Sequence, residues 1–175
     1  FFNGKNRTQL YSSVASNLSS TPESIRFDEQ CAQTIYALTA AIDIKDHYTY
    51  QHSQNVSVYA ARLAESIGLD SEHVEIIRQA GLLHDVGKIG IPENILGKQG
   101  RLTNDEYAIM RQHAEASVSM LRYLPSLDYV VPAVYGHHER WDGKGYPRGL
   151  AGEDIPISAR CLCVADSFDA MTTDR

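Results

Sequence analysis

Cysteine is scarce in these 175 residues, and long apolar runs are missing. The three cysteines, Cys31, Cys161 and Cys163, are odd in number, and residues 161 and 163 would point about 200° apart on a helix, which excludes a local disulfide. They are predicted to be reduced packing residues of a cytoplasmic protein. No apolar run reaches the roughly 18 residues that span a bilayer, and the first residues lack the order of a signal peptide. No segment of this chain is therefore expected to insert into a membrane.

Positive charge is also in deficit, because Lys and Arg number 16 against 22 Asp and Glu, for a formal net charge of −6. Such a surface repels polyanions, so neither a long nucleic acid nor an anionic membrane is expected as a partner. A small phosphate ester could still bind to local basic groups and metals. With 43% hydrophobic residues, the chain has the composition of one domain that can bury a sizeable core.

Strand-like alternation is absent, and apolar residues recur instead at intervals of three and four, which predicts an all-α fold. Residues 1–27 are rich in Ser, Asn and Thr and are predicted to be a linker or the tail of an upstream connecting helix. The domain proper is predicted over residues 28–175. Because the sequence begins without Met and ends at Arg175 within an apparent helix, we expect it to be a piece of a longer chain, truncated at its C-terminus.

Helix start and stop signals divide this domain into amphipathic segments. Gly68 is expected to stop one helix, Asp70 to cap the next, and Thr103 with Glu106 to form a capping box for a third. The expected apolar faces run from Cys31 to Ile42, His52 to Ile67, Val74 to His84, Met110 to Leu121, Val130 to Trp141 and Leu162 to Ala170.

Histidine and aspartate residues continue several of these apolar faces. A single histidine on such a face is usually a satisfied core residue, but here five helices each deliver an imidazole or a carboxylate to the same interior. Buried polar groups without partners are destabilising, so the cluster must be fully hydrogen-bonded or bind metal. The predicted metal ligands are His52, His84, Asp85, His113, His137, His138 and Asp166.

The ligand types indicate the kind of metal and the chemistry. Imidazole and carboxylate without thiolate suit iron, manganese, nickel, cobalt or zinc, and argue against a closed thiolate zinc site. Seven ligands are too many for one ion, so two ions are expected. Two ions roughly 3.5–4 Å apart that share a carboxylate and a hydroxide can activate that hydroxide for in-line displacement at phosphorus. The residues therefore predict hydrolysis of a phosphate ester.

Two long motifs resemble those of the HD-GYP family. The first runs from His84 to Pro92 (HDVGKIGIP) and the second from His137 to Pro147 (HHERWDGKGYP), and the likeness extends from about Asp43 to Arg175. HD-GYP proteins belong to the HD metal-dependent phosphohydrolases, so the resemblance implies an HD-domain helical bundle with a buried two-metal site. It also implies hydrolysis of cyclic di-GMP, either to linear pGpG only or further to GMP, often behind an upstream sensor or receiver domain.

The resemblance also implies roles for single residues. It places one metal on His52, His84, Asp85 and Asp166, and a second on His113, His137 and His138, with Asp85 bridging to both. Iron or manganese is the first expectation for these ions. Lys88 matches the family lysine that faces the hydroxide and the scissile phosphate, and Arg175 matches an arginine that contacts substrate phosphate. Tyr48 stands where some members use a glutamate to hold a third metal, so two metals are expected.

The loop that follows His138 is predicted to border the pocket, because Gly143 and Gly145 permit tight turns there. Tyr146 is expected either to stack on a guanine or to present a surface to a partner signalling domain, and Arg148 is a weaker candidate for phosphate contact. Three alternatives stay open: another cyclic dinucleotide such as cyclic GMP-AMP, a different nucleotide, or a non-catalytic regulatory module that binds metal or nucleotide. Formation of a homodimer is also left open.

Overall fold

The computed structural model describes residues 33–34, 37, 39–42, 45 and 51–173. The all-α prediction is confirmed over these residues, where the only β-type pairing is an isolated bridge between Asp142 and Ala151. No helix in the described ranges has the length and apolar character needed to cross a membrane. The predictions for residues 1–27, Cys31, Tyr48 and Arg175 lie outside the described residues.

The described elements from residue 52 onward belong to one compact unit. In chain order they are α3 (His52–Ser66), α4 (Ser71–Leu83), the 3-10 helix η2 (Val86–Gly90), α5 (Glu93–Leu96), α6 (Asn104–Met110), α7 (His113–Leu121), η3 (Pro125–Val130), α8 (Val131–Gly136), η4 (Gly152–Asp154) and α9 (Ile157–Thr172).

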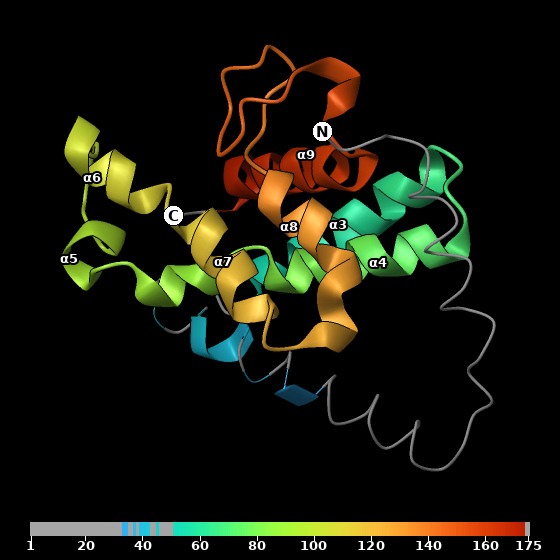
Figure 1. Cartoon of the computed structure of the whole chain (residues 1–175), viewed down its shortest axis with the longest axis horizontal. Helices are drawn as coiled ribbons and strands as arrows, with labels where there is room; N and C mark the ends of the chain where they lie inside the picture. Colours follow the sequence, from blue (N-terminus) through green and yellow to red (C-terminus); the bar gives the residue numbers. More distant parts are fainter. Residues whose placement is uncertain (1–32, 35–36, 38, 43–44, 46–50, 174–175) are drawn as a thin grey trace, which may run out of the picture. The chain divides into compact units, whose positions relative to one another are not determined.

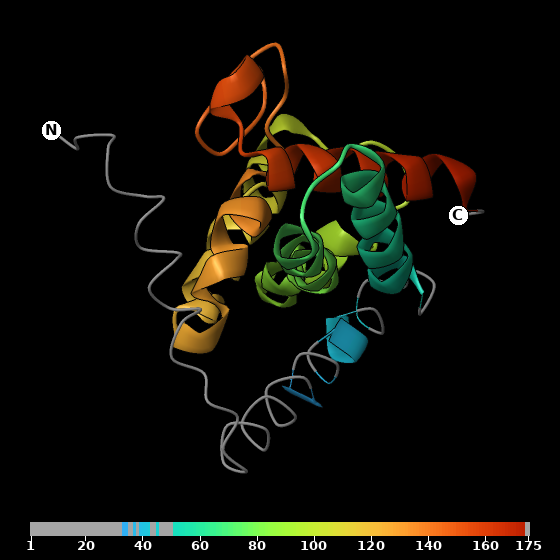
Figure 2. The same cartoon turned by 90° about the vertical axis from the view of Figure 1, so that its right-hand side faces the viewer.

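Helix α4 lies at the centre of this unit, with α3, α8 and α9 packed around it (Figures 1 and 2). Its apolar face, which includes Ile77 and Leu83, is fully buried, and burial of each such side chain contributes about 1.5–3 kcal/mol. Gly81 permits the close crossing of α3, because a Cβ atom there would lie 2.5 Å from the Cα of Ser57. This crossing brings the end of α4 beside the start of α3.

The capping signals in the sequence are confirmed. The Asp70 side chain accepts a hydrogen bond from the backbone N–H of His73 at 2.9 Å, and Thr103 and Glu106 form the predicted capping box. Gly68 follows α3 with φ of +83°, a left-handed conformation that glycine adopts without strain. These helix ends depend on residues close in sequence, which is why the sequence predicted them.

Three predicted helices are shorter than their apolar patterns suggested. Helix α4 ends at Leu83, so His84 follows it instead of lying within it. The helix predicted from residue 103 to residue 121 is divided into α6 and α7, and α8 ends at Gly136, which leaves Trp141 63% exposed in the loop beyond. The predicted metal ligands therefore lie at helix ends more often than on helix faces.

Close packing against α7 accounts for the end of α4. A Cβ atom at Gly87 would lie 2.1 Å from the carbonyl oxygen of His113, so only glycine allows η2 to approach α7 this closely. The Gly87 N–H donates to the Ser117 hydroxyl at 2.8 Å, and that hydroxyl donates to the His84 carbonyl at 3.2 Å. A tertiary contact thus replaces the next helical turn and fixes the segment that carries His84 and Asp85.

Candidate metal centre

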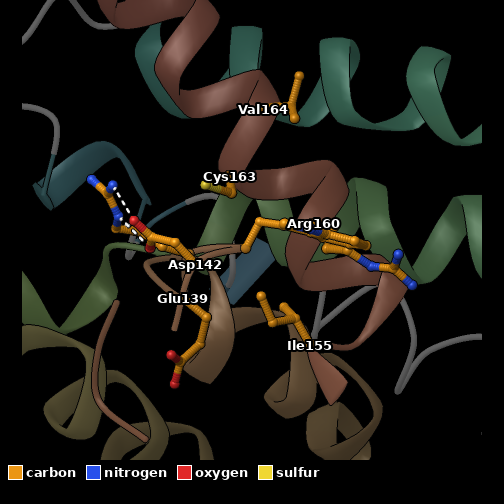
Figure 3. A pocket seen from close by; sticks show the side chains of 8 residues that line it. Glu139, Asp142, Ile155, Arg160, Cys163 and Val164 are labelled. Carbon is orange, nitrogen blue, oxygen red and sulfur yellow. Dashed lines mark hydrogen bonds and ion pairs between the residues drawn. The ribbon is translucent and has the colours of Figure 1, made fainter. Parts of the chain in front are cut away.

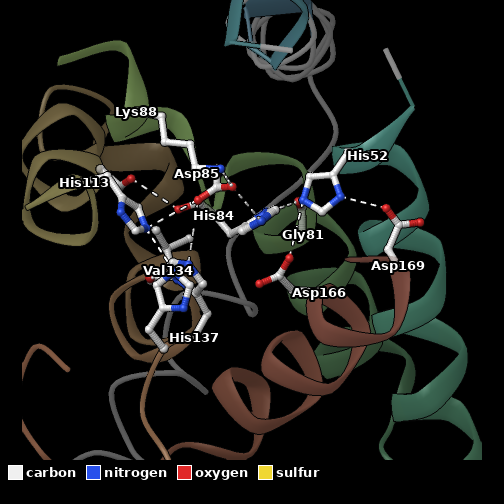
Figure 4. Close-up of polar contacts among 12 residues, drawn as sticks. His52, Gly81, His84, Asp85, Lys88, His113, Val134, His137, Asp166 and Asp169 are labelled. Atoms are coloured by element: carbon white, nitrogen blue, oxygen red, sulfur yellow. Dashed lines mark hydrogen bonds and ion pairs between the residues drawn. The ribbon is translucent and has the colours of Figure 1, made fainter. Parts of the chain in front are cut away.

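The seven predicted ligands come together from five regions of the fold, and Figure 4 labels all of them except His138. His52 begins α3, His84 and Asp85 follow α4, His113 begins α7, His137 and His138 follow α8, and Asp166 lies within α9. Most of them are buried, and His84 and His137 are fully inaccessible to solvent. Residues that are far apart in the sequence therefore form one interior cluster.

The cluster divides into two sets of ligand atoms that share one carboxylate. In each set, the candidate ligand atoms lie within 4.8 Å of one another. The His52 group consists of His52, His84 and Asp85, and the His113 group consists of Asp85, His113, His137 and His138. Asp166 lies beside the first of these, with its Oδ1 at 3.4 Å from Nε2 of His52.

The two carboxylate oxygens of Asp85 face different groups. Its Oδ2 lies 3.2 Å from Nε2 of His84, whereas its Oδ1 lies 3.4 Å from Nε2 of His113. Three of these atoms are buried and have no hydrogen-bond partner: Nε2 of His84, Oδ1 of Asp85 and Nε2 of His137. Buried polar atoms that converge without hydrogen bonds are destabilising unless a cation binds them. The cluster therefore fits a divalent metal site.

Three of the histidines are oriented by the backbone. Nδ1 of His84, His113 and His137 lies 2.6–2.8 Å from the carbonyl oxygen three residues earlier. Since a carbonyl only accepts hydrogen bonds, each Nδ1 carries a proton and donates it, which leaves Nε2 directed into the cluster. This arrangement sets both the tautomer and the ring orientation.

His52 is held differently, and the residue that holds it was missed by the sequence analysis. His52 is the first residue of α3, and residue 49, three positions earlier, lies outside the described residues. Nδ1 of His52 lies 2.7 Å from Oδ2 of Asp169, whose other oxygen accepts a hydrogen bond from the Asn55 amide at 2.9 Å. Asp169 is only 1% exposed. The signal was its position one helical turn after Asp166, on the same face of α9.

Charges within the cluster shift its pKa values in opposite directions. Burial and the neighbouring histidines lower the pKa of His138 to about 4 and that of His137 well below its ordinary value. Burial also acts to lower the pKa of His84, but the adjacent Asp85 carboxylate raises it to about 9. Burial raises the pKa of Asp85, yet the Lys88 ammonium, 2.8 Å away, and His84 hold it well below the ordinary range.

The predicted substrate-binding residues differ in how close they lie to the metal-binding cluster. Lys88 lies at the cluster through its contact with Asp85, and the Tyr146 ring stacks on His138 with centroids 4.6 Å apart. The Arg148 guanidinium lies 5.3 Å from the centre of the Tyr135 ring on α8, and no contact with the cluster is found for it among the described residues. Arg175 lies outside the described residues.

The loop between α8 and α9 is fixed by a buried glutamate. Oε1 of Glu139 accepts from the backbone N–H of Arg148 at 2.7 Å, and Oε2 accepts from that of Leu150 at 2.9 Å. On the α9 side of this loop lies a cavity of about 530 Å³, which is lined by Ile155, Arg160 and Cys163 and by the ion-paired Arg140 and Asp142 (Figure 3). None of the seven predicted ligands lines this cavity.

The chain is similar to several bacterial cyclic-dinucleotide phosphodiesterases. The chain is 42% identical over 151 residues to the 3'3'-cGAMP-specific phosphodiesterase 2 of Vibrio cholerae, covering 84% of this chain and 28% of that protein. It is 40% identical over 151 residues to a cyclic di-GMP phosphodiesterase of Thermotoga maritima, covering 85% and 41%. It is 41% identical over 150 residues to the cyclic di-GMP phosphodiesterase response regulator RpfG of Xanthomonas campestris, covering 85% and 40%.

The chain thus spans between 28% and 41% of the lengths of these curated relatives. A family model described as an HD domain matches residues 36–175, which include every element from α3 to α9 and all seven predicted ligands. The resemblance to HD-GYP proteins that the motifs indicated is confirmed by these matches. The chain belongs to the HD domain family.

Proposed function

We propose that this chain is the catalytic domain of a metal-dependent phosphodiesterase that hydrolyses cyclic di-GMP to linear pGpG. The observation that carries this proposal is the position of Asp85, whose two carboxylate oxygens face two separate sets of histidines. A carboxylate placed in this way is suited to bridge two ions, which is the arrangement used for in-line displacement at phosphorus. The names of the relatives from Thermotoga maritima and Xanthomonas campestris support the choice of substrate.

Two divalent ions are proposed for this site. One would be held by the His52 group together with Asp166, and the other by the His113 group, with Asp85 shared between them. When bound, the ions would supply a hydroxide nucleophile and positive charge at the scissile phosphate. Iron or manganese is proposed, since the donors are imidazole and carboxylate without thiolate.

Lys88 is the proposed cationic partner of the scissile phosphate. Its Nζ lies 2.8 Å from Oδ2 of Asp85, and its side chain is 15% exposed, so the ammonium borders both the cluster and solvent. A cation held in this position stabilises the negative charge that develops on the phosphate oxygens. Arg175 stays a predicted phosphate contact, as does Arg148, whose guanidinium would first have to leave the Tyr135 ring.

Cyclic GMP-AMP is the second candidate substrate, because a relative with 42% identity is named for its specificity toward 3'3'-cGAMP. The upstream sensor or receiver domain, contact with partner signalling domains through the loop that carries Tyr146, and a homodimer stay predictions. Cyclic di-GMP and cyclic GMP-AMP differ in one of their two bases. The choice between these substrates therefore depends on which bases the protein accepts near the metal centre.

A panel of cyclic dinucleotides tests the proposed function. The metal-loaded protein is incubated with cyclic di-GMP, 3'3'-cGAMP and cyclic di-AMP, and the products are separated by chromatography. Conversion of cyclic di-GMP to pGpG is expected, with loss of activity after chelation of the metal and recovery when metal is restored. Absence of hydrolysis of every cyclic dinucleotide by protein with a full metal complement would contradict the proposal.

Metal loading is expected to depend on pH in one group only. In the metal-free protein the pKa of His84 is raised to about 9, so below that pH a proton occupies the Nε2 that a metal needs. Binding to the His52 group should weaken by up to about tenfold per pH unit below pH 9, because each ion must displace this proton. The pKa of His138 is lowered to about 4, and the pKa values of His113 and His137 are also lowered, so the His113 group should be free of this competition at neutral pH.

Calorimetric titration with manganese under anaerobic conditions, at about pH 6 and about pH 9, measures this difference. One tightly bound ion is expected at the lower pH and two at the higher pH, with proton release accompanying the second ion. Equal affinity for both ions at the two pH values would contradict the assignment of the raised pKa to His84.

A further inference from the structure

A second, smaller cavity lies on the α7 side of the loop that carries Tyr146. Its volume is about 140 Å³, and it is lined by Ala108, Arg111, Gln112, Glu115, Tyr146 and Pro147. Sites that enclose a whole small molecule usually measure roughly 300–1,000 Å³. This cavity, called the α7 cavity below, is therefore of a size for one ring system and not for a complete dinucleotide.

The α7 cavity begins one aromatic ring away from the metal centre. The Tyr146 ring stacks on the His138 ring at 4.6 Å between centroids and an interplanar angle of 29°, and Nε2 of His138 lies 3.1 Å from Nε2 of His113. In a cyclic dinucleotide, one ribose separates each base from the phosphates of the ring. A base in this cavity would therefore leave a phosphate within reach of the cluster.

Two flat groups line the cavity, the Tyr146 ring and the Arg111 guanidinium, which lies 4.7 Å from the centre of that ring. Outside the cavity, the Tyr107 ring meets Tyr146 edge-on at 6.2 Å. Proteins hold unpaired bases by stacking them on aromatic rings and on arginine guanidinium planes. The α7 cavity offers both kinds of surface beside a predicted metal ligand.

The polar groups of the cavity match one purine better than the other. Arg111 can donate two hydrogen bonds to O6 and N7 of guanine. Glu115, one helical turn further along, can accept from the N1–H and the amino group of guanine, whereas adenine has a lone pair at N1 that a carboxylate repels. Both side chains are exposed to solvent, and the Arg111 guanidinium lies over the rings of Tyr107 and Tyr146.

We propose that the α7 cavity is a guanine subsite of this phosphodiesterase. Arg111, which lies over the Tyr146 ring, donates to the O6–N7 edge of the base, and Glu115 accepts from its N1–H and amino group. The proposal rests on the proposed function and adds a residue that determines substrate choice. Both candidate substrates contain at least one guanine, whereas cyclic di-AMP contains none.

Replacement Glu115→Gln tests the subsite. The amide presents one donor and one acceptor, which suits the N1 and amino group of adenine and no longer suits both donors of guanine. The ratio of kcat/KM for cyclic di-GMP to that for cyclic di-AMP is expected to fall by about tenfold or more, since a bidentate base contact discriminates by that factor. Glu72→Gln is the matched control, because it removes the same charge at the exposed start of α4.

A second variant, Arg111→Ala, should lower kcat/KM for cyclic di-GMP by roughly tenfold at unchanged metal content, because it removes a contact to the base and no metal ligand. The exposed Arg122→Ala, at the end of α7, is its control. Wild-type kinetics in both cavity variants would overturn the subsite, even if the wild-type protein cleaves cyclic di-GMP.

Calorimetric binding of linear pGpG and pApA separates the subsite from the proposed function. A preference for pGpG that Glu115→Gln reverses would support the guanine subsite, even for a protein that hydrolyses no cyclic dinucleotide. Equal binding of the two linear dinucleotides by the wild-type protein would overturn the subsite, while hydrolysis of cyclic di-GMP would leave the proposed function intact.

Discussion

The Asp85→Ala variant is expected to lose both metal ions together and at least about 10³-fold in turnover of cyclic di-GMP. Its carboxylate faces the His52 group with one oxygen and the His113 group with the other. Without it, two cations would lie close together and lack the negative charge that they share. Their mutual repulsion should then lower the affinity of both groups, even though all other predicted ligands remain.

Metal content by mass spectrometry of the dialysed protein, measured beside turnover, checks this result. Asp128→Ala is a suitable control, since Asp128 is exposed on η3 and contributes nothing to the cluster. Asp85→Asn, which keeps the volume of the side chain, separates loss of charge from loss of packing if the alanine variant is unstable. Retention of both ions at wild-type occupancy in either variant would show that Asp85 is not the bridge.

Replacement of Asp169 is expected to weaken one metal position and spare the other. Asp169→Ala removes the acceptor for Nδ1 of His52, so this ring loses the contact that orients it toward the cluster. Loss of such a partner behind a metal-ligating histidine typically lowers metal affinity by roughly 10- to 100-fold. The His113 group should bind its ion as before, because its histidines His113 and His137 are oriented by backbone carbonyls.

Asp169→Asn separates loss of the negative charge from loss of the hydrogen bond to His52. The amide keeps an oxygen that can accept from His52, and the Asn55 amide can rotate to match its NH₂ group, so only the negative charge is lost. A smaller loss of affinity than in the alanine variant is expected in a titration that resolves the two ions. If both ions were lost equally in Asp169→Ala, the residue would support the fold as a whole and not the orientation of His52.

The candidate site could be predicted from the sequence to the level of its residues, but the helix ends around it could not. The motifs identified His84 and Asp85 as neighbours, and the apolar pattern ran from Val74 to His84, which suggested that α4 carries His84. The chain leaves the helix at Leu83 because Gly87 must pack on the backbone of His113. Periodicity reports which face of a helix is apolar, and contains no information on a contact with a distant segment.

Asp169 illustrates the same limit at the level of a single side chain. It lies three residues after Asp166, yet its role depends on His52, 117 residues earlier in the chain. Nothing in the sequence indicates that His52 contacts Asp169, because that contact follows from how α3 packs on α9. The α7 cavity was missed for a related reason, since Tyr146 and Glu115 approach each other only when the loop closes over α7.

What the sequence by itself determined was the helical class, the caps at Asp70 and Thr103, and the set of side chains available to bind metal, since these depend on residue type and on near neighbours. Only the tertiary structure decided that the two oxygens of Asp85 face different histidine groups and that Asp169 orients His52. Positions of side chains from different helices depend on how those helices cross and where each one ends. Packing among distant segments sets both, and local sequence patterns do not specify it.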